Sequence, residues 1–292
     1  VSVKEPRSYG GEPVFAKTLQ NLDNLGRLTI ETPKTFVNLQ LEDNLWRVLE
    51  IGNYYAGYRQ INNLFNDFAD ARIYRRRGPA TDADEKKFGL DDNAFRVITR
   101  DAGGQILNSV LIGKAAADNL YHFARIEGEK DVFLITGNFS FPKTAVSWLQ
   151  QPLLSLSPAD IRSLKIGQET AVRSDIIVPF KIKGKQAVPD ISRYLNALGF
   201  VAAYDVRRSA DFDRLQFSAP KSLSVTTFDG LVVTIEVYGR TGEEYWASLK
   251  FSTTTLPTTA VNDYIKSSAF LYEDWYFRLA PDVGRILFNA FI

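Results

Sequence analysis

A weak internal repeat constrains the fold of this chain more than any other feature of its sequence. Similar residues recur in the same order in both halves, and Ile61 and Ile191 open the first matched pair at an offset of 130 residues. The matched pairs are residues 61–74 with 191–204, 97–101 with 225–229, and 121–126 with 245–250. A chain that repeats a pattern at the length of a domain is expected to fold as two similar units.

The composition favours two well-packed domains and excludes several classes of protein. With 292 residues and 45% hydrophobic side chains, the chain has the size and apolar content of two ordinary domains. Its net charge is only +1, and this balance lacks the basic excess that a phosphate backbone attracts. We therefore expect no disorder and no nucleic-acid partner.

Cysteine and methionine are absent, and His122 is the single histidine. Disulfides, thiolate nucleophiles and zinc–thiolate sites are thereby excluded, as is a His-rich metal site within one chain. His122 lies between Tyr121 and Phe123 in a predicted strand, with no local nucleophile or carboxylate to work with it. We interpret it as a structural residue, and we predict no catalytic residue, no cofactor and no metal.

Hydrophobic periodicity predicts a similar succession of elements in both halves. In the first half, strands are expected at residues 28–30, 35–41, 45–49, 94–100, 105–112, 120–126 and 132–135, with helices at 57–74 and from Pro142. In the second half, strands are expected at residues 176–182, 222–228, 231–238, 244–251 and 275–279, with helices at 189–204, 262–271 and 281–292. Residues 153–164 are interpreted as a linking segment with one helical turn.

Tight turns between the strands, of which Asp229-Gly230 is the clearest, make consecutive strands antiparallel. We therefore predict an α+β fold of two tandem repeats, each an antiparallel β-meander with amphipathic helices packed on one face. The expected organisation is an extended lead-in at residues 1–27, a first repeat at 28–165 and a second repeat at 166–292 with an insertion at 253–271.

Several segments of the chain are similar to those of a known family. Residues 11–19 precede a strand pair that ends in residues 45–48, and an amphipathic helix follows. Residues 87–91 then precede a strand, residues 132–135 follow a turn, and residues 153–161 carry spaced leucines before an aspartate. Over most of its length the chain resembles the bacterial DUF4340 family, which comprises domains of unknown function.

The resemblance implies a location and a context without implying a reaction. Members of the family typically carry an N-terminal membrane anchor followed by an extracytoplasmic region, and they often accompany ABC-transporter systems. No catalytic residue is established for the family, so none is carried over. We expect a periplasmic or otherwise extracytoplasmic protein that is membrane-anchored at full length, with Val1 opening a fragment or processed product that lacks the anchor.

Two arginine clusters are the candidate contacts with a partner or an anion. Arg75, Arg76 and Arg77 follow the predicted first helix, and Arg207 and Arg208 occupy the equivalent place in the second half. These side chains could bind an acidic protein face or an anionic lipid headgroup. The alternative is that they are solvated charges at a helix C-terminus, where the helix dipole favours cations.

Other polar motifs fit no known site. The acidic runs at residues 82–85 and 91–92 lack the calcium-loop pattern and are interpreted as solvated loops. The glycines at residues 103–104 and 113 lack the spacing of a phosphate loop and are interpreted as turns.

Three functional hypotheses follow. The first is a non-enzymatic extracytoplasmic binding or assembly module of a bacterial membrane complex, accessory to an ABC-transporter system and partnered by membrane-complex proteins. The second is an enzyme that acts on an envelope polysaccharide or peptide, with carboxylates brought together at the cleft between the repeats. The third is a lipid-binding module, which requires an apolar cavity.

Overall fold

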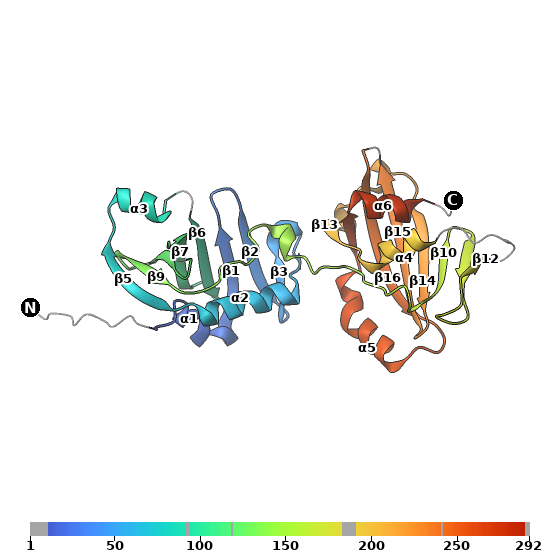
Figure 1. The fold of residues 1–292 in the computed structure, drawn as a ribbon, viewed down its shortest axis with the longest axis horizontal. Helices are drawn as coiled ribbons and strands as arrows, with labels where there is room; N and C mark the ends of the chain where they lie inside the picture. The colour runs from blue at the N-terminus through green and yellow to red at the C-terminus, as the bar shows by residue number, and fades with distance from the viewer. Residues whose placement is uncertain (1–10, 92–93, 118, 183–190, 241, 290–292) are drawn as a thin grey trace, which may run out of the picture. The chain divides into compact units, whose positions relative to one another are not determined.

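The computed structural model describes residues 11–91, 94–117, 119–182, 191–240 and 242–289 (Figure 1). The chain divides into two compact units, Val1–Gln150 and Gln151–Ile292. Each unit contains one antiparallel sheet and a few short helices, so the mixed architecture expected from the sequence is confirmed. Among the described residues, no helix combines the length and the apolar character needed to cross a bilayer.

The first unit is organised around a nine-stranded sheet in the order β4-β3-β2-β1-β6-β7-β8-β9-β5. Its strands are β1 (Leu25–Glu31), β2 (Phe36–Glu42), β3 (Leu45–Val48), β4 (Tyr54–Tyr55), β5 (Ile73–Pro79), β6 (Phe95–Asp101), β7 (Ile106–Ala115), β8 (His122–Ile126) and β9 (Asp131–Ile135). Its α-helices are α1 (Ala16–Gln20), α2 (Tyr58–Asp70) and α3 (Asp82–Phe88).

The core of the first unit lies between the sheet and α1 and α2, which lie along the same face (Figure 1). The apolar side of α2 carries Ile61, Leu64 and Phe68 at helical spacing, and all three are buried. Phe15, which precedes α1, stacks on Phe68 with ring centroids 4.2 Å apart. Strands β1 and β2 add alternate residues to this core, namely Leu28, Ile30, Val37 and Leu39.

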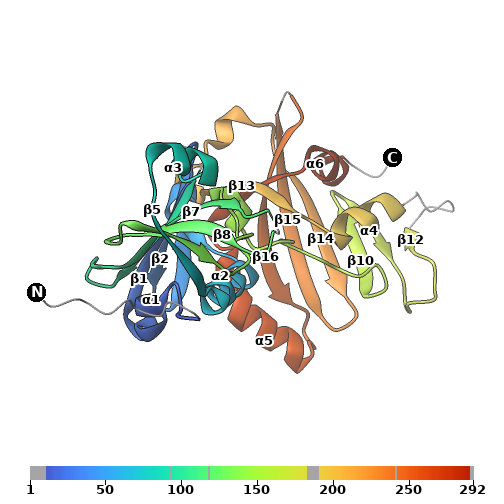
Figure 2. The same ribbon diagram turned by 60° about the vertical axis from the view of Figure 1, so that its left-hand side comes forward.

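The second unit contains an eight-stranded sheet in the order β12-β11-β10-β14-β15-β16-β17-β13. Its strands are β10 (Ile161–Ile166), β11 (Glu169–Val172), β12 (Lys181–Ile182), β13 (Ala203–Arg208), β14 (Lys221–Thr227), β15 (Leu231–Arg240), β16 (Glu244–Thr253) and β17 (Trp275–Leu279). Its α-helices are α4 (Ser192–Gly199), α5 (Thr259–Ser268) and α6 (Pro281–Phe288). Helices α4 and α6 contact each other, and α6 packs on β14, β15 and β16 (Figure 2).

The strand orders of the two sheets agree when β4 is set aside. The series β3-β2-β1-β6-β7-β8-β9-β5 corresponds in position to β12-β11-β10-β14-β15-β16-β17-β13. The pairing register also shifts at the same place in each sheet. The shift lies between Leu25 and Arg27 where β1 pairs with β6, and between Ile161 and Ser163 where β10 pairs with β14.

This irregularity explains why the sequence analysis misses β10. The expected linking segment at residues 153–164 ends in a strand, whose buried residues are Ile161, Leu164 and Ile166. A β-bulge places an extra residue after Ile161, so the first two buried positions are three residues apart. That spacing is typical of a helical turn, and it conceals the strand from a search for alternating residues.

The arginine clusters do not lie at helix ends, so that interpretation is wrong. Helix α2 ends at Asp70, and Ala71 is already extended with φ −69 and ψ 119. Arg75, Arg76 and Arg77 therefore lie on β5, which pairs with β9, while Arg207 and Arg208 lie on β13, which pairs with β17. Pairing with a distant strand overrides the local helical periodicity here.

The expected organisation also differs from the structure in detail. The predicted boundary between residues 165 and 166 falls inside β10, whereas the compact units meet between Gln150 and Gln151. The predicted lead-in at residues 1–27 contains α1 and the start of β1, although residues 1–10 lie outside the described part. The insertion at residues 253–271 contains α5, which lies between β16 and β17.

Three other predicted elements are much shorter in the structure. The helix expected from Pro142 is only a 3-10 turn at Ala145–Trp148. The strand expected at residues 176–182 is limited to Lys181–Ile182. The helix expected at residues 189–204 is limited to α4, Ser192–Gly199, and the chain enters β13 at Ala203. Residues 189–190 lie outside the described part.

Replacing Phe68 by alanine should destabilise the first unit by roughly 3–5 kcal/mol, because the change leaves a cavity beside Phe15 in a closed core. Urea unfolding followed by peptide-level hydrogen exchange measures the loss and assigns it to residues before Gln150. Tyr58→Ala is the control, since Tyr58 is 76% exposed. Equal losses for the two variants would show that α2 does not hold the core together.

Candidate anion-binding surfaces

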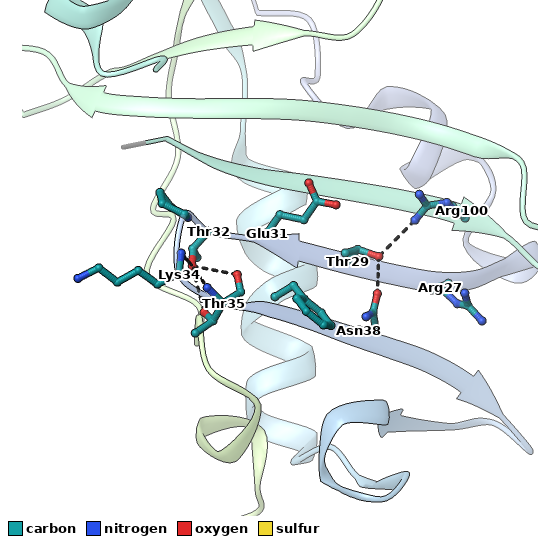
Figure 3. Close-up of a pocket in the computed structure, with 10 residues that line it drawn as sticks. Arg27, Thr29, Glu31, Thr32, Lys34, Thr35, Asn38 and Arg100 are labelled. Carbon is teal, nitrogen blue, oxygen red and sulfur yellow. Dashed lines mark hydrogen bonds between the residues drawn. The ribbon is translucent and has the colours of Figure 1, made fainter. Parts of the chain in front are cut away.

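The face of the first sheet opposite α1 and α2 carries polar side chains. On β1, Arg27, Thr29 and Glu31 alternate with the buried residues Leu28 and Ile30, so the two sets point to opposite faces. A hollow of about 650 Å³ lies on this face (Figure 3). It is lined by Arg27, Thr29, Glu31, Thr32, Pro33, Lys34, Thr35, Phe36, Asn38 and Arg100.

Arg27 and Arg100 are directly opposite each other in the antiparallel pairing of β1 with β6. Side chains in such a position have Cβ atoms about 5 Å apart, and two like charges there destabilise the sheet. Figure 3 shows the two guanidinium groups lying apart from each other, as their repulsion requires. The two cations thus lie at adjacent positions of the sheet, and their side chains do not contribute to holding β1 against β6.

Neutral acceptors hold both arginines. Arg27 Nη2 donates to Gln40 Oε1 over 2.9 Å, and Arg100 Nη1 donates to Thr29 Oγ1 over 3.2 Å. Thr29 Oγ1 in turn donates to Asn38 Oδ1 over 2.9 Å. Within the described parts of the chain, neither guanidinium forms an ion pair with a carboxylate. Their positive charge is therefore not neutralised by a direct partner.

Two carboxylates near the hollow are engaged elsewhere. Glu31 lies 3.8 Å from Arg96 Nε in a solvent-exposed ion pair. Asp101 follows Arg100, and its Oδ1 accepts the backbone N–H of Gln105 over 2.8 Å. A further cation, Lys34, lies in the turn between β1 and β2 and lines the hollow. The hollow therefore has the charge and the donors to bind an anion.

The predicted cluster at residues 75–77 lies on β5, at one edge of the first sheet. Arg76 pairs with the buried carboxylate of Asp131. The guanidinium of Arg75 lies 5.8 Å from the ring centroid of Tyr74, and that of Arg77 lies 5.9 Å from the ring of Phe88. Charged side chains on an edge strand also oppose pairing with a further strand.

The predicted residues Arg207 and Arg208 lie on β13, at one edge of the second sheet. Their guanidinium groups lie 4.7 Å from the ring centroid of Trp246 and 5.1 Å from that of Trp275, respectively. A third arginine, Arg214, lies 5.4 Å from the ring centroid of Tyr276, and no pattern in the sequence indicates it. An arginine close to a buried aromatic ring is held by a cation–π interaction.

Two of these rings, Trp246 and Tyr276, belong to a buried aromatic cluster that also contains Phe212. Phe212 stacks on Tyr276 with centroids 4.1 Å apart and on Phe217 with centroids 4.9 Å apart. Arg240 lies 5.2 Å from the ring of Phe217 and pairs with the carboxylate of Glu244. Arginine thus lies over both ends of the stack, and the rings fix the positions of the cations.

The recess beside the insertion is a separate feature of the second unit. About 480 Å³ in volume, it lies between β16 and the segment that leads from α5 into β17. Its buried phenol, Tyr272, donates to the backbone oxygen of Leu153 over 2.8 Å. Burial raises the pKa of Tyr272, with Tyr264 adding to the effect. The phenol is therefore a neutral structural donor at physiological pH.

The acidic run at residues 82–85 forms the start of α3 and is not a loop. Thr81 caps this helix, because its side chain accepts the N–H of Asp84 and the Asp84 side chain accepts the N–H of Thr81. The hydrogen bonds from Thr81 lower the pKa of Asp84. Among the described residues, no three histidine, aspartate or glutamate side chains gather as a metal site would require.

One carboxyl group has a strongly raised pKa. Burial, and then the neighbouring charge of Asp70, raise the pKa of Asp67 from 3.8 to about 6. Both residues lie near the C-terminus of α2, where the helix dipole also disfavours negative charge. The pair lies outside the recesses described above, so it does not supply the convergent carboxylates that a glycosidase needs.

A family model described as "Domain of unknown function (DUF4340)" matches residues 46–220, more than half of the chain. No curated protein matches the chain, and no solved structure matches it.

The raised pKa of Asp67 should make the first unit lose stability as the pH rises from about 4 to about 6. In this window the unfolded carboxyl is ionised while the folded one retains its proton, so ionisation favours the unfolded chain. Asp67→Asn should flatten the pH dependence of the urea midpoint, and Asp70→Asn should only reduce it. A carboxyl NMR titration that places the pKa of Asp67 near 4 would contradict this assignment.

Proposed function

The chain belongs to the DUF4340 family, and we propose that it is a non-enzymatic, extracytoplasmic binding and assembly module of a bacterial membrane complex. Its partners are membrane-complex proteins, and the system it serves is an ABC transporter. The family resemblance supports the location and the transporter context. The arrangement of arginines on β13 supports the binding role.

The observation that carries the proposal is the set of arginines held over aromatic rings on β13 and in the segment that follows it. Arg207 lies over Trp246 and Arg214 lies over Tyr276 on one face of the sheet, whereas Arg208 lies over Trp275 on the other face. The three arginines are exposed, whereas the rings are buried. Because the rings restrict the guanidinium groups in advance, less conformational entropy is lost when a partner binds. Arginine is also enriched among the residues that dominate the energy of protein interfaces.

The charge of this surface indicates an acidic partner. The carboxylate of Asp205 accepts the N–H of Val206 over 2.8 Å, and that of Asp213 accepts the N–H of Leu215 over 3.1 Å. Among the described residues, Arg207 and Arg214 form no ion pair. Their guanidinium groups can therefore form forked hydrogen bonds with carboxylates of a partner protein.

The two units, in this proposal, are tandem copies of one ancestral domain. Their agreement in strand order supports this view, as do the shared irregularities of register. Besides the shift after Leu25 and Ile161, the edge pairing shifts between Ile73 and Arg75 in β5 and between Ala203 and Asp205 in β13. Bulges mark particular positions in related sheets, so their recurrence favours duplication over coincidence.

Reversing the charge of Arg207 and Arg214 together should abolish capture of the partner. The experiment is crosslinking of the full-length anchored protein in its membranes, followed by purification and mass spectrometry. The wild-type protein should recover the same transporter subunits in every replicate experiment. The variant Arg207→Glu with Arg214→Glu should lose them, because its negative charges repel an acidic surface.

The matched control is Lys17→Glu with Arg59→Glu, which makes the same change of charge at exposed positions of the first unit. This control should retain the partners. Equal recovery by both double variants would exclude the β13 surface, and recovery of no membrane protein by the wild type would exclude the assembly role.

A further inference from the structure

The first sheet holds a pair of arginines that its fold does not require. Arg27 and Arg100 pair directly after the bulge in β1. In the second sheet, the residues that pair directly after the corresponding bulge are Ser163 and Thr226. The positions held by Arg27 and Arg100 in the first sheet are therefore held by small hydroxyl side chains in the second sheet. Opposed arginines weaken a sheet, so their presence at this position calls for a role other than stability.

We propose that the hollow over β1, β2 and β6 binds the phosphate group of a phosphate ester, through Arg27 and Arg100. This site lies in the first unit, whereas the arginines of the proposed function, Arg207, Arg208 and Arg214, lie in the second. The phosphate site does not depend on that function.

Two adjacent guanidinium groups match phosphate better than they match a single carboxylate. A carboxylate presents two oxygens, and one arginine fork satisfies both of them. A phosphate monoester presents three oxygens and carries up to two charges. Such a group neutralises the repulsion that keeps the two guanidinium groups apart, so Arg27 and Arg100 can each turn a fork toward it. Among the described residues, Arg27 donates one side-chain hydrogen bond, to Gln40, and Arg100 donates one, to Thr29, so several N–H donors of each guanidinium remain.

The floor of the hollow is organised around Thr29. Thr29 is buried two residues along β1 from Arg27 and lies diagonally across from Arg100. Its hydroxyl connects Arg100 to Asn38. Asn38 is itself fixed by Glu50, which accepts its Nδ2 over 2.8 Å and its backbone N–H over 3.0 Å. Glu50 thus orients the support for Arg100 through Asn38 and Thr29 without pairing with either arginine, which leaves both cations for a ligand.

The ends of the hollow differ in charge and indicate where the phosphate lies. Figure 3 shows Arg27 and Arg100 at one end and Lys34 at the other, with Glu31 away from Arg27. The phosphate belongs at the arginine end, where Glu31 repels it least. Phe36, which is 59% exposed, lines the same hollow and offers an apolar contact to the rest of the ester.

The test is calorimetric titration of the purified chain with inorganic phosphate, with glycerol 3-phosphate, and with vesicles that contain phosphatidylglycerol. The variant Arg27→Ser with Arg100→Thr installs the residues of the second sheet. It should bind glycerol 3-phosphate roughly tenfold more weakly or worse, because hydrogen bonds to a charged group are lost. Lys17→Ser with Arg59→Thr removes the same charge at exposed positions and should bind as the wild type does.

Stability distinguishes a binding role from a structural one. Without ligand, the variant Arg27→Ser with Arg100→Thr (the Ser/Thr variant) should unfold at the same urea concentration as the wild type or at a higher one. The reason is that it removes the repulsion between two like charges. A second variant, Arg100→Lys, keeps the charge but loses the fork, and it should stay folded while binding several-fold more weakly. A less stable Ser/Thr variant together with unchanged binding by Arg100→Lys would assign the pair a structural role and overturn the proposal.

The remaining outcomes identify the source of the phosphate or reject the site. Arginine-dependent binding of glycerol 3-phosphate, with none to vesicles, assigns a soluble ester. Arginine-dependent binding to vesicles assigns a lipid headgroup. Binding of no probe at millimolar concentration, or equal binding by the Ser/Thr variant and the wild type, overturns the proposal. None of these outcomes bears on capture of membrane proteins through Arg207 and Arg214.

Discussion

Burial of one face of each antiparallel sheet beneath its helices is the constraint on which the rest of the structure depends. In the first unit, Leu64 and Phe68 of α2 pack on that face, and in the second unit α6 packs on β14, β15 and β16. The opposite face is covered in part, by the cluster around Phe88 in the first unit and by the cluster around Phe212 in the second, and it carries polar side chains elsewhere. Binding residues can therefore vary there without disturbing the core, and Arg27 on β1 is an example of this freedom.

The local signals in the sequence were sufficient for the class of fold and for the regular strands. Alternation predicted β2 and β15, and the Asp229-Gly230 turn predicted the hairpin of β14 and β15. The bulged strand β10 was missed because one extra residue changes the spacing of its buried side chains. The sequence of β5 continues the helical periodicity of α2, whereas its extended conformation depends on pairing with β9, about 60 residues away in the chain.

The candidate sites were less predictable than the fold, for a related reason. Arg207 and Arg208 were identified from their charge alone, and the rings that hold them became visible only in the structure. Arg27 and Arg100 carry no signal in the sequence, because 73 positions separate them and only the register of β1 against β6 places them side by side. Lone arginines are common, and their pairing is a tertiary property.

The two sheets differ at two kinds of place, the insertion that contains α5 and the side chains at corresponding strand positions. The sequence draws attention to the insertion, because α5 has no counterpart between β8 and β9. A difference between positions that correspond in strand order and in register is more informative, because the backbone pairing of β1 with β6 matches that of β10 with β14. Arg27 and Arg100 occupy positions that Ser163 and Thr226 fill elsewhere. Two sheets of one strand order thus separate what the fold requires from what a ligand requires, and the arginine pair belongs to the second set.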